Sequence, residues 1–211
     1  MKTLFRSTLF FLMLFGSCEM IFAQKATNVW KAQVALGFNR PFWGGFVNEL
    51  NSKNLNFPTV NLGIQYMFKP QLGAKLDYGF NRFSSGDDVP EFKTNYSRIN
   101  AQFVYDPTTS LGFLPQRMGV VGHAGPGISF VKPLGNLGDN KQTYANFMAG
   151  VELHYAMSET ISLYGDLSYI YGFTSLDDYD PPLTGLGAFN GNVLTATLGI
   201  TFSLSGCYTC N

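Results

Sequence analysis

Alternation of apolar and polar residues along eight segments is the feature that most limits the fold of this chain. In residues 30–39 every second side chain is apolar, from Trp30 to Phe38, and the residues between them are small or polar. Successive side chains of a β-strand point to opposite faces, so this period predicts strands and not helices. The predicted strands are residues 30–39, 60–68, 72–81, 97–105, 118–130, 145–155, 161–173 and 194–204.

The size of the expected interior decides which face of these strands points outward. Eight strands with about five apolar residues each carry roughly 40 apolar side chains, and an eight-stranded barrel only just encloses its own side chains. The Gly, Ser, Asn and Thr residues of the polar face fit that interior, whereas the Phe and Tyr residues do not. The pattern therefore predicts an all-β fold, an eight-stranded antiparallel up-and-down transmembrane β-barrel with its apolar face in lipid. A soluble protein with an aromatic core is the alternative.

The composition agrees with a membrane barrel. Only 13% of the 211 residues are charged, 16% are aromatic and the net charge is 0, whereas about 25% of the residues in a soluble domain are charged. Many aromatic residues fall near the ends of the predicted strands, as in the interfacial girdles of membrane barrels. Because no basic excess exists to neutralise phosphates, the composition argues against nucleic-acid binding.

The first residues have the pattern of a secretory signal peptide. Lys2 and Arg6 supply positive charge, residues 9–15 form an apolar core and Ala23 precedes the expected cleavage site. A lipoprotein signal that uses Cys18 is the alternative. The expected divisions are a signal peptide, residues 1–23, and an outer-membrane barrel domain, residues 24–211, with strands within 30–204 and a tail over 205–211.

The connections between the predicted strands differ in length at the two ends. With a periplasmic N-terminus, the outer loops are residues 40–59, 84–96, 131–144 and 174–192, and the inner turns are 69–71, 106–117 and 156–160. Barrels of the bacterial outer membrane have short periplasmic turns and longer external loops. The connections therefore predict an integral outer-membrane location, although the inner turn 106–117 is unusually long.

This architecture resembles the N-terminal barrel of OmpA-type outer-membrane proteins, particularly the small barrels of Bacteroidetes-like bacteria. The resemblance covers residues 30–204, and its sharper motif is the final strand, which is similar to the assembly signal of such proteins. The residues that match this signal are Thr197, Gly199, Phe202 and Leu204. The resemblance implies recognition by the barrel assembly machinery. Many such proteins continue into a peptidoglycan-binding domain, whereas this sequence stops at Asn211, so we expect no cell-wall anchoring.

Six charged residues fall on the predicted inward face. They are Lys31, Lys75, Asp77, Arg98, Glu152 and Asp166. An unpaired buried charge is costly, so bases and acids in a narrow lumen are expected to pair. We expect Glu152 and Asp166 to share Lys31 and Lys75 and to plug the lumen. A gated narrow pore is the alternative.

The sequence contains few candidates for catalysis. His123 and His154 are its only histidines, both on predicted strands, and no acidic residue lies close to His123 in the sequence. Outer-membrane enzymes place acid, His and Ser groups at the outer rim, whereas His154 is expected near the periplasmic rim. We therefore interpret both histidines as hydrogen-bonded lumen residues and predict no enzymatic activity, cofactor or metal.

The outer loops are the expected place for partners. Loop 40–59 carries an aromatic group that could bind a partner or lie on lipid headgroups, namely Phe42, Trp43 and Phe46. Loops 84–96 and 174–192 carry acidic residues that are either solvated or bridged by divalent ions to lipopolysaccharide, namely Asp87, Asp88, Glu91, Asp177, Asp178 and Asp180. A structural or surface-interaction role follows, with a narrow channel or small-ligand-binding barrel as the alternative and an outer-membrane enzyme as a third, less favoured one.

The C-terminal tail contains a closely spaced pair of cysteines, Cys207 and Cys210. A C-x-x-C pair can be a redox motif or half of a metal site. Because no second pair or nearby histidine completes a metal shell, a disulfide formed in an oxidising envelope is the preferred interpretation.

Overall fold

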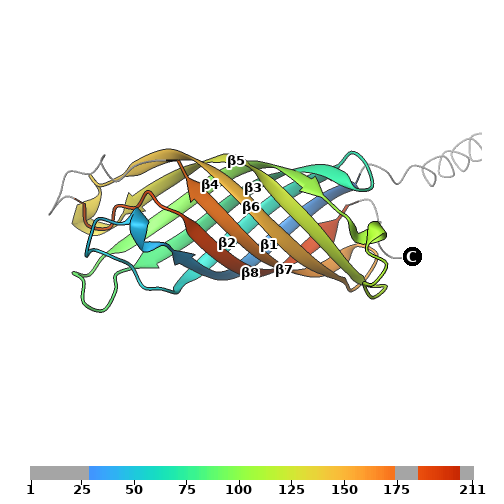
Figure 1. Cartoon of the computed structure of the whole chain (residues 1–211), viewed down its shortest axis with the longest axis horizontal. Helices are drawn as coiled ribbons and strands as arrows, with labels where there is room; N and C mark the ends of the chain where they lie inside the picture. The colour runs from blue at the N-terminus through green and yellow to red at the C-terminus, as the bar shows by residue number, and fades with distance from the viewer. Residues whose placement is uncertain (1–28, 174–184, 205–211) are drawn as a thin grey trace, which may run out of the picture.

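The computed structural model describes residues 29–173 and 185–204, in which eight strands form one closed barrel (Figure 1). The strands are β1 (Val29–Pro41), β2 (Asn56–Met67), β3 (Leu72–Ser84), β4 (Lys93–Tyr105), β5 (Met118–Pro133), β6 (Gln142–Ala156), β7 (Ile161–Gly172) and β8 (Val193–Ser203). Short 3-10 helices lie in the connections: η2 (Trp43–Gly45), η3 (Thr108–Ser110) and η4 (Gly135–Leu137). Within these residues, no helix has the length and apolar character to cross a membrane.

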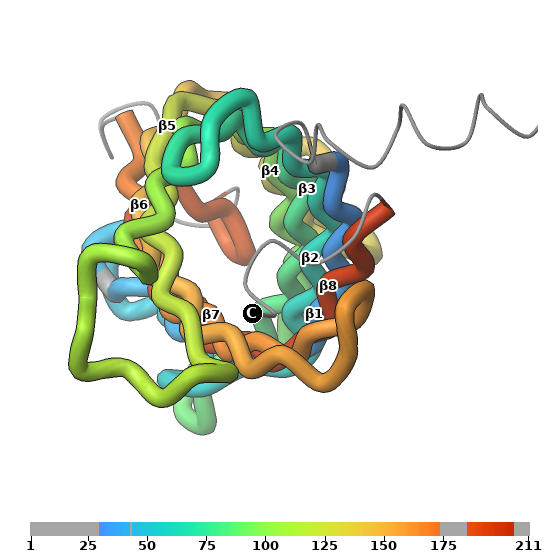
Figure 2. Tube along the Cα trace, turned by 90° about the vertical axis from the view of Figure 1, so that its right-hand side faces the viewer, coloured from blue at the N-terminus to red at the C-terminus, as the bar shows by residue number. Residues whose placement is uncertain are grey.

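The closed ring follows from antiparallel pairing of every strand with its neighbours in sequence, and of β1 with β8 (Figure 2). Ala35 of β1 pairs with Asn61 of β2 on one side and with Gly199 of β8 on the other. A closed sheet leaves no edge of unpaired backbone groups, which hydrocarbon could not satisfy. The predicted fold class is therefore confirmed.

The predicted faces of the strands are also confirmed. Along β1 the side chains of Leu36 and Phe38 are 51% and 48% exposed, whereas those of Gln33 and Asn39 are 5% and 1% exposed. The same alternation continues around the barrel, so its outer surface is a belt of Leu, Ile, Val, Phe and Tyr side chains. An apolar outside around a polar inside is the arrangement of a barrel that spans a lipid bilayer.

Several strands extend beyond their predicted bounds at the end where the longer loops lie. Strand β3 continues to Ser84, β4 begins at Lys93 and β6 begins at Gln142. Many inward residues at this end of β3, β4, β5 and β6 are apolar or aromatic, namely Phe83, Tyr96, Val131 and Tyr144, although the inward Thr94 is polar. The expectation that Phe and Tyr side chains belong outside the barrel is therefore wrong at this end, where the lumen encloses an apolar layer.

The described ends of the chain, Val29 and Leu204, lie at the same end of the barrel, and the longer loops lie at the other (Figure 1). At the first end, the long connection 106–117 is held against β5 by the hydroxyl of Thr108. That hydroxyl accepts from the backbone N–H of Val120 (3.1 Å), while the Thr108 N–H donates to Asp106 Oδ1 (3.0 Å). These bonds give the turn 106–117 an ordered structure, although it is longer than the short turns expected at this end of the barrel.

A charge placed at the middle of the apolar belt tests whether this surface faces lipid. Leu76 is 57% exposed, halfway along β3. We expect Leu76→Arg to lower the free energy of unfolding in lipid vesicles by about 2–4 kcal/mol, because arginine is costly at the bilayer midplane of such barrels. Phe113→Arg in the turn 106–117 is the matched control, since Phe113 is 78% exposed outside the strands. Equal stability of both variants and the unchanged chain in urea titrations would contradict the lipid-facing assignment.

Candidate functional site

The middle of the lumen is occupied by a buried arginine. Arg98 of β4 is fully buried, and its Nη1 donates to Asp77 Oδ2 and to Asn100 Oδ1 (3.2 Å). Its Nη2 donates to Asn61 Oδ1 (3.1 Å) from β2. Charge-assisted bonds of this kind are the strongest available to a buried guanidinium. The guanidinium therefore ties the neighbouring strands β2, β3 and β4 together on the lumen side of the wall.

Gly79 provides the space for this guanidinium. A Cβ at Gly79 would lie 2.6 Å from Arg98 Nε, and the Asp77, Asn61 and Asn100 bonds prevent the guanidinium from moving away. We expect Gly79→Ala to lower the free energy of unfolding by about 1–3 kcal/mol through overpacking. The control is Gly165→Ala on the outer face, where the nearest atom would be Leu198 Cδ2 at 3.4 Å.

Strand interiors ordinarily gain stability, roughly 0.5–1 kcal/mol, when Gly is replaced by Ala. The two substitutions are therefore expected to have opposite signs in urea titrations of the folded barrel. A stabilising effect at Gly79 would show that the guanidinium is not fixed where the structure places it.

A second network is centred on Glu152 of β6. Lys75 Nζ from β3 lies 2.6 Å from Glu152 Oε1, with both side chains buried. Glu152 Oε2 accepts from Gln33 Nε2 of β1 (3.0 Å), and the Nε2–H of His154 donates to the same oxygen (2.6 Å). The carboxylate thus joins strands on opposite walls of the barrel.

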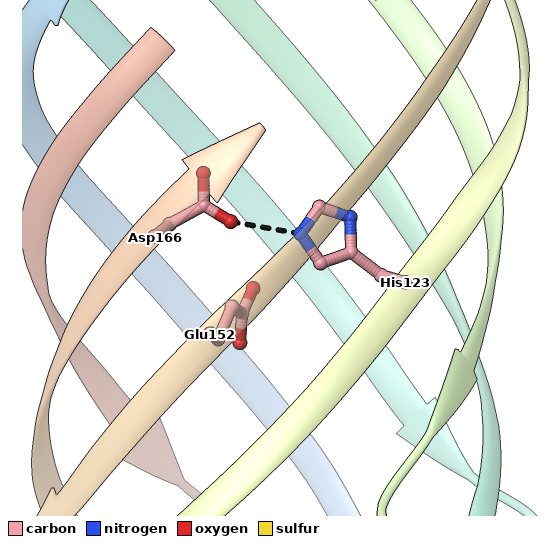
Figure 3. Close-up of side chains that lie close together, drawn as sticks. All are labelled: His123, Glu152 and Asp166. Carbon is pink, nitrogen blue, oxygen red and sulfur yellow. Dashed lines mark hydrogen bonds and ion pairs between the residues drawn. The ribbon is translucent and has the colours of Figure 1, made fainter. Parts of the chain in front are cut away.

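A third group lies beside it and brings His123 of β5 to Asp166 of β7 (Figure 3). The Nε2–H of His123 donates to Asp166 Oδ2 (2.8 Å), and Ser168 Oγ donates to Asp166 Oδ1 (2.6 Å). The other ring nitrogen, Nδ1, contacts Gln102 Oε1. Both carboxylate oxygens and both ring nitrogens therefore have partners inside the wall.

Five of the six predicted lumen charges are buried in these networks, although the pairing differs from the prediction. Asp166 contacts His123, for which the sequence showed no acidic partner, and does not share Lys75. Lys31 is half-buried at the end of β1, and it makes no ion pair with any residue in the described ranges. The expected sharing of Lys31 by Glu152 and Asp166 is therefore not found.

The His123 group differs from a catalytic triad in its geometry. In a Ser–His–acid triad the acid holds one ring nitrogen, and the other accepts the serine proton. Here Asp166 Oδ2 and Ser168 Oγ both lie beside His123 Nε2, at 2.8 and 3.4 Å respectively, and Gln102 Oε1 contacts Nδ1. No ring nitrogen is left to act as a base, so this arrangement holds the wall together and does not activate Ser168.

The same residues include donors that a metal ion can use. One ligand atom each from His123, Glu152 and Asp166 lies within 4.8 Å of the others, and imidazole with carboxylates suits several divalent metals. However, the Lys75 ammonium lies 2.6 Å from Glu152, and Ser168 donates to Asp166. Because these donors already satisfy the carboxylates, we assign the cluster to the lumen network.

Above the polar networks, an aromatic cluster closes the end of the barrel that carries the longer loops. Phe46 and Phe189 enter from the loops and meet Phe83 of β3, with ring centroids 4.7 Å apart for Phe46–Phe189 and 5.0 Å for Phe83–Phe189. The buried members of this outer plug are Phe46, Phe83, Phe92, Tyr96, Val131, Tyr144, Met148, Ile170, Phe189 and Val193. Backbone bonds from Asn190 N–H to Gly45 O and from Phe42 N–H to Asn192 O hold the loops together (2.9 Å each).

The aromatic residues predicted for an exposed group in loop 40–59 therefore separate. Phe46 is 2% exposed inside the outer plug, which corrects that prediction. Phe42 remains on the rim against Tyr169, with ring centroids 5.7 Å apart. The Trp43 side chain lies outside the described part of the structure. The sequence did not identify the plug, because the alternating pattern gives no information about which loop residues fold inward.

Other predicted site residues lie in the final strand and in the loops. Thr197 and Gly199 of β8 face the lumen, whereas Phe202 and Leu204 point outward. Asp87 lies 4.0 Å from Lys53, and Glu91 lies 3.9 Å from Lys93, both pairs being exposed to solvent. The predictions that fall outside the described residues are the signal peptide 1–23, the acidic residues Asp177, Asp178 and Asp180, and the cysteines Cys207 and Cys210.

Comparison with known proteins gives the fold and not the family. No protein-family model and no curated protein sequence matches the chain. Among solved structures, neisserial surface protein A is similar at 15% identity, with 84% of this chain and 97% of that chain covered and a TM-score of 0.55. A major outer membrane protein of Thermus thermophilus is similar at 15% identity over 84% and 99%, also with a TM-score of 0.55. The attachment invasion locus protein Ail of Yersinia pestis is similar at 14% identity over 84% and 97%, with a TM-score of 0.50.

Proposed function

We propose that this chain is an integral protein of the bacterial outer membrane, a closed barrel with a structural or surface-interaction role and no pore. The apolar belt supports insertion in a bilayer. Similarity of fold to outer-membrane and surface proteins of other bacteria supports the choice of membrane. The OmpA-type resemblance of the sequence supports the same location.

The filled lumen is the observation that carries the proposal of a closed barrel. The network around Glu152 crosses the lumen from β6 to β3 and β1, and the buried Arg98 guanidinium fills the lumen beside β2, β3 and β4. The outer plug then covers them with the packed rings of Phe46, Phe83 and Phe189. An ion crossing the barrel would need to break buried ion pairs and displace aromatic packing. A narrow channel that opens through movement of the loops is the competing function.

The outer rim is the surface that we propose for interactions. A cavity of about 270 Å³ opens there between two loops and the end of β7. Its walls include two aromatic side chains and two amide side chains, namely Phe42, Tyr171, Asn190 and Asn192. Amide groups beside aromatic faces supply directed hydrogen bonds next to apolar contact, which is the composition of a small binding site.

The outward residues of β8 support recognition during assembly. Phe202 and Leu204 are 42% and 73% exposed at the end of the barrel where the described chain begins and ends. They are therefore accessible to the barrel assembly machinery, as the resemblance of the final strand implies. We also propose cleavage of residues 1–23 and a disulfide between Cys207 and Cys210, both in keeping with export to an oxidising compartment.

Gel migration of the extracted protein tests the membrane barrel directly. We expect extraction to require detergent, and we expect the unheated protein to migrate differently from the boiled protein, because a closed barrel resists unfolding. Fractionation should place it with the outer membrane, and added protease should cut the outer loops of whole cells. A protein that is soluble without detergent and migrates identically before and after boiling would overturn the proposal.

A further inference from the structure

The charged residues of the strands are distributed unequally between the two faces. Every carboxylate in the described strands faces the lumen, namely Asp77, Glu152 and Asp166. The cations on the outer face are Arg40, Arg82, Lys93 and Lys132, and each lies within three residues of the strand end that carries the longer loops. The outward residues of the strands therefore carry positive charge at one end only, with no carboxylate among the strand residues to neutralise it.

Three outward residues form a continuous row across adjacent strands. Arg82 of β3 pairs with Asn95 of β4, and Asn95 pairs with Lys132 of β5. Arg82 Nε donates to Asn95 Oδ1 (3.0 Å), which orients the guanidinium along the row. Neighbouring strands lie about 4.8 Å apart, so the two cations stand roughly 10 Å apart with an amide between them. We call Arg82, Asn95 and Lys132 the outer cation row.

The outer cation row lies directly above lipid-facing side chains. One step toward the middle of the barrel, Phe80 pairs with Ser97 and Ser97 with Phe130. The Arg82 guanidinium carbon lies 5.9 Å from the centre of the Phe80 ring. Aromatic residues of membrane barrels mark the interface between hydrocarbon and headgroups. The cations therefore stand at headgroup level, on the outside of the wall.

We propose that the outer cation row binds the phosphate groups of an outer-leaflet glycolipid, a phosphorylated lipopolysaccharide. A ligand that contacts both the outer cation row and the lipid-facing side chains below it needs negative charge directly above an apolar part. A phosphorylated lipid has both, whereas a free anion has only the charge. Arginine and lysine are suited to phosphate oxygens, and Asn95 offers an amide between them. Lys93 stands near the row, but Glu91 lies 3.9 Å from its ammonium, so it is not counted in the site.

This inference rests on the outer-membrane location proposed above, and a binding measurement on the folded full chain tests it. The probe is diphosphorylated lipid A, and the comparison ligand is the same lipid without its phosphates. A cation near an anionic membrane surface contributes about five-fold in affinity. We therefore expect R82Q/K132Q to bind the phosphorylated probe about 25-fold more weakly than the unchanged chain, while binding of the dephosphorylated lipid stays the same.

The matched control removes two cations from the opposite end of the barrel. Lys69 and Arg117 are exposed in the turns there, so K69Q/R117Q has the same change in net charge and should keep full affinity. Equal losses in both variants, or full affinity in R82Q/K132Q, would overturn the proposal. Displacement of the probe by an equal concentration of inorganic phosphate would show a free-anion site and would also overturn it.

Failure of this inference and failure of the proposed function give different results. If the barrel is heat-modifiable on gels but binds the two lipids equally, only the glycolipid site is ruled out. If the chain is soluble without detergent, the proposed outer-membrane location itself is ruled out. Heat-modifiability of each variant also shows that it folds before its binding is compared.

Discussion

Glu152→Gln is expected to lower the free energy of unfolding of the barrel by about 3–5 kcal/mol, because removing one partner of a buried ion pair leaves the other charge uncompensated. The charge left behind is that of Lys75, whose ammonium lies 2.6 Å from Glu152 and is buried with it. The carboxylate also accepts from Gln33 and from His154, so those two bonds lose their charge assistance. Urea titration of the barrel in lipid vesicles, followed by gel migration without boiling, measures the loss.

The double variant Lys75→Met/Glu152→Gln is the control. Replacing both partners of a buried pair is often neutral, so the double variant should be more stable than Glu152→Gln alone. Lys75→Met is measured alone as well. If the loss of the double variant equals the sum of the losses of Lys75→Met and Glu152→Gln, the two side chains do not interact, which would contradict the lumen network around Glu152.

Phe189→Ala is expected to have an effect of similar size at the other end of the lumen. Phe189 is fully buried and packs against Phe46 and Phe83, so truncation leaves a cavity in the outer plug. Large-to-small changes of buried Phe cost about 3–5 kcal/mol. We expect a loss of that order in urea titrations, together with faster protease cleavage of residues 185–192, because the backbone of this segment is held beside Gly45.

The matched control for this variant is Phe113→Ala. Phe113 has the same side chain but is 78% exposed in the turn 106–117, so its truncation should change the stability little. Equal effects of the two substitutions would contradict the packing of Phe189 in the outer plug. Unchanged cleavage of residues 185–192 in Phe189→Ala would show that the plug does not hold this loop.

The strands and their faces could be predicted because one period governs the membrane-spanning part of the chain. A residue such as Leu36 must face lipid and Gln33, an odd number of positions away, must face the lumen, so the sequence pattern follows the pleat. The pattern is inverted at Phe83 and Tyr96, which face inward while the polar residues Arg82 and Asn95 face outward, so the predicted strands stop short of this region.

The contacts inside the lumen could not be predicted in the same way. Glu152 and Lys75 come from β6 and β3, which are not neighbours, and Gln33 reaches Glu152 from β1. Which side chains meet across the interior depends on strand tilt and stagger, which are properties of the closed barrel. The pairing of His123 with Asp166 is of the same kind.

The closed lumen is the central claim, and planar-bilayer recording of the unchanged chain tests it most directly. A lumen filled by the Arg98 and Glu152 networks and covered by the outer plug predicts no steady conductance after insertion. A general porin added to the same bilayer would show that the recording detects open barrels. Large, steady conductance of the unchanged chain would contradict the closed lumen.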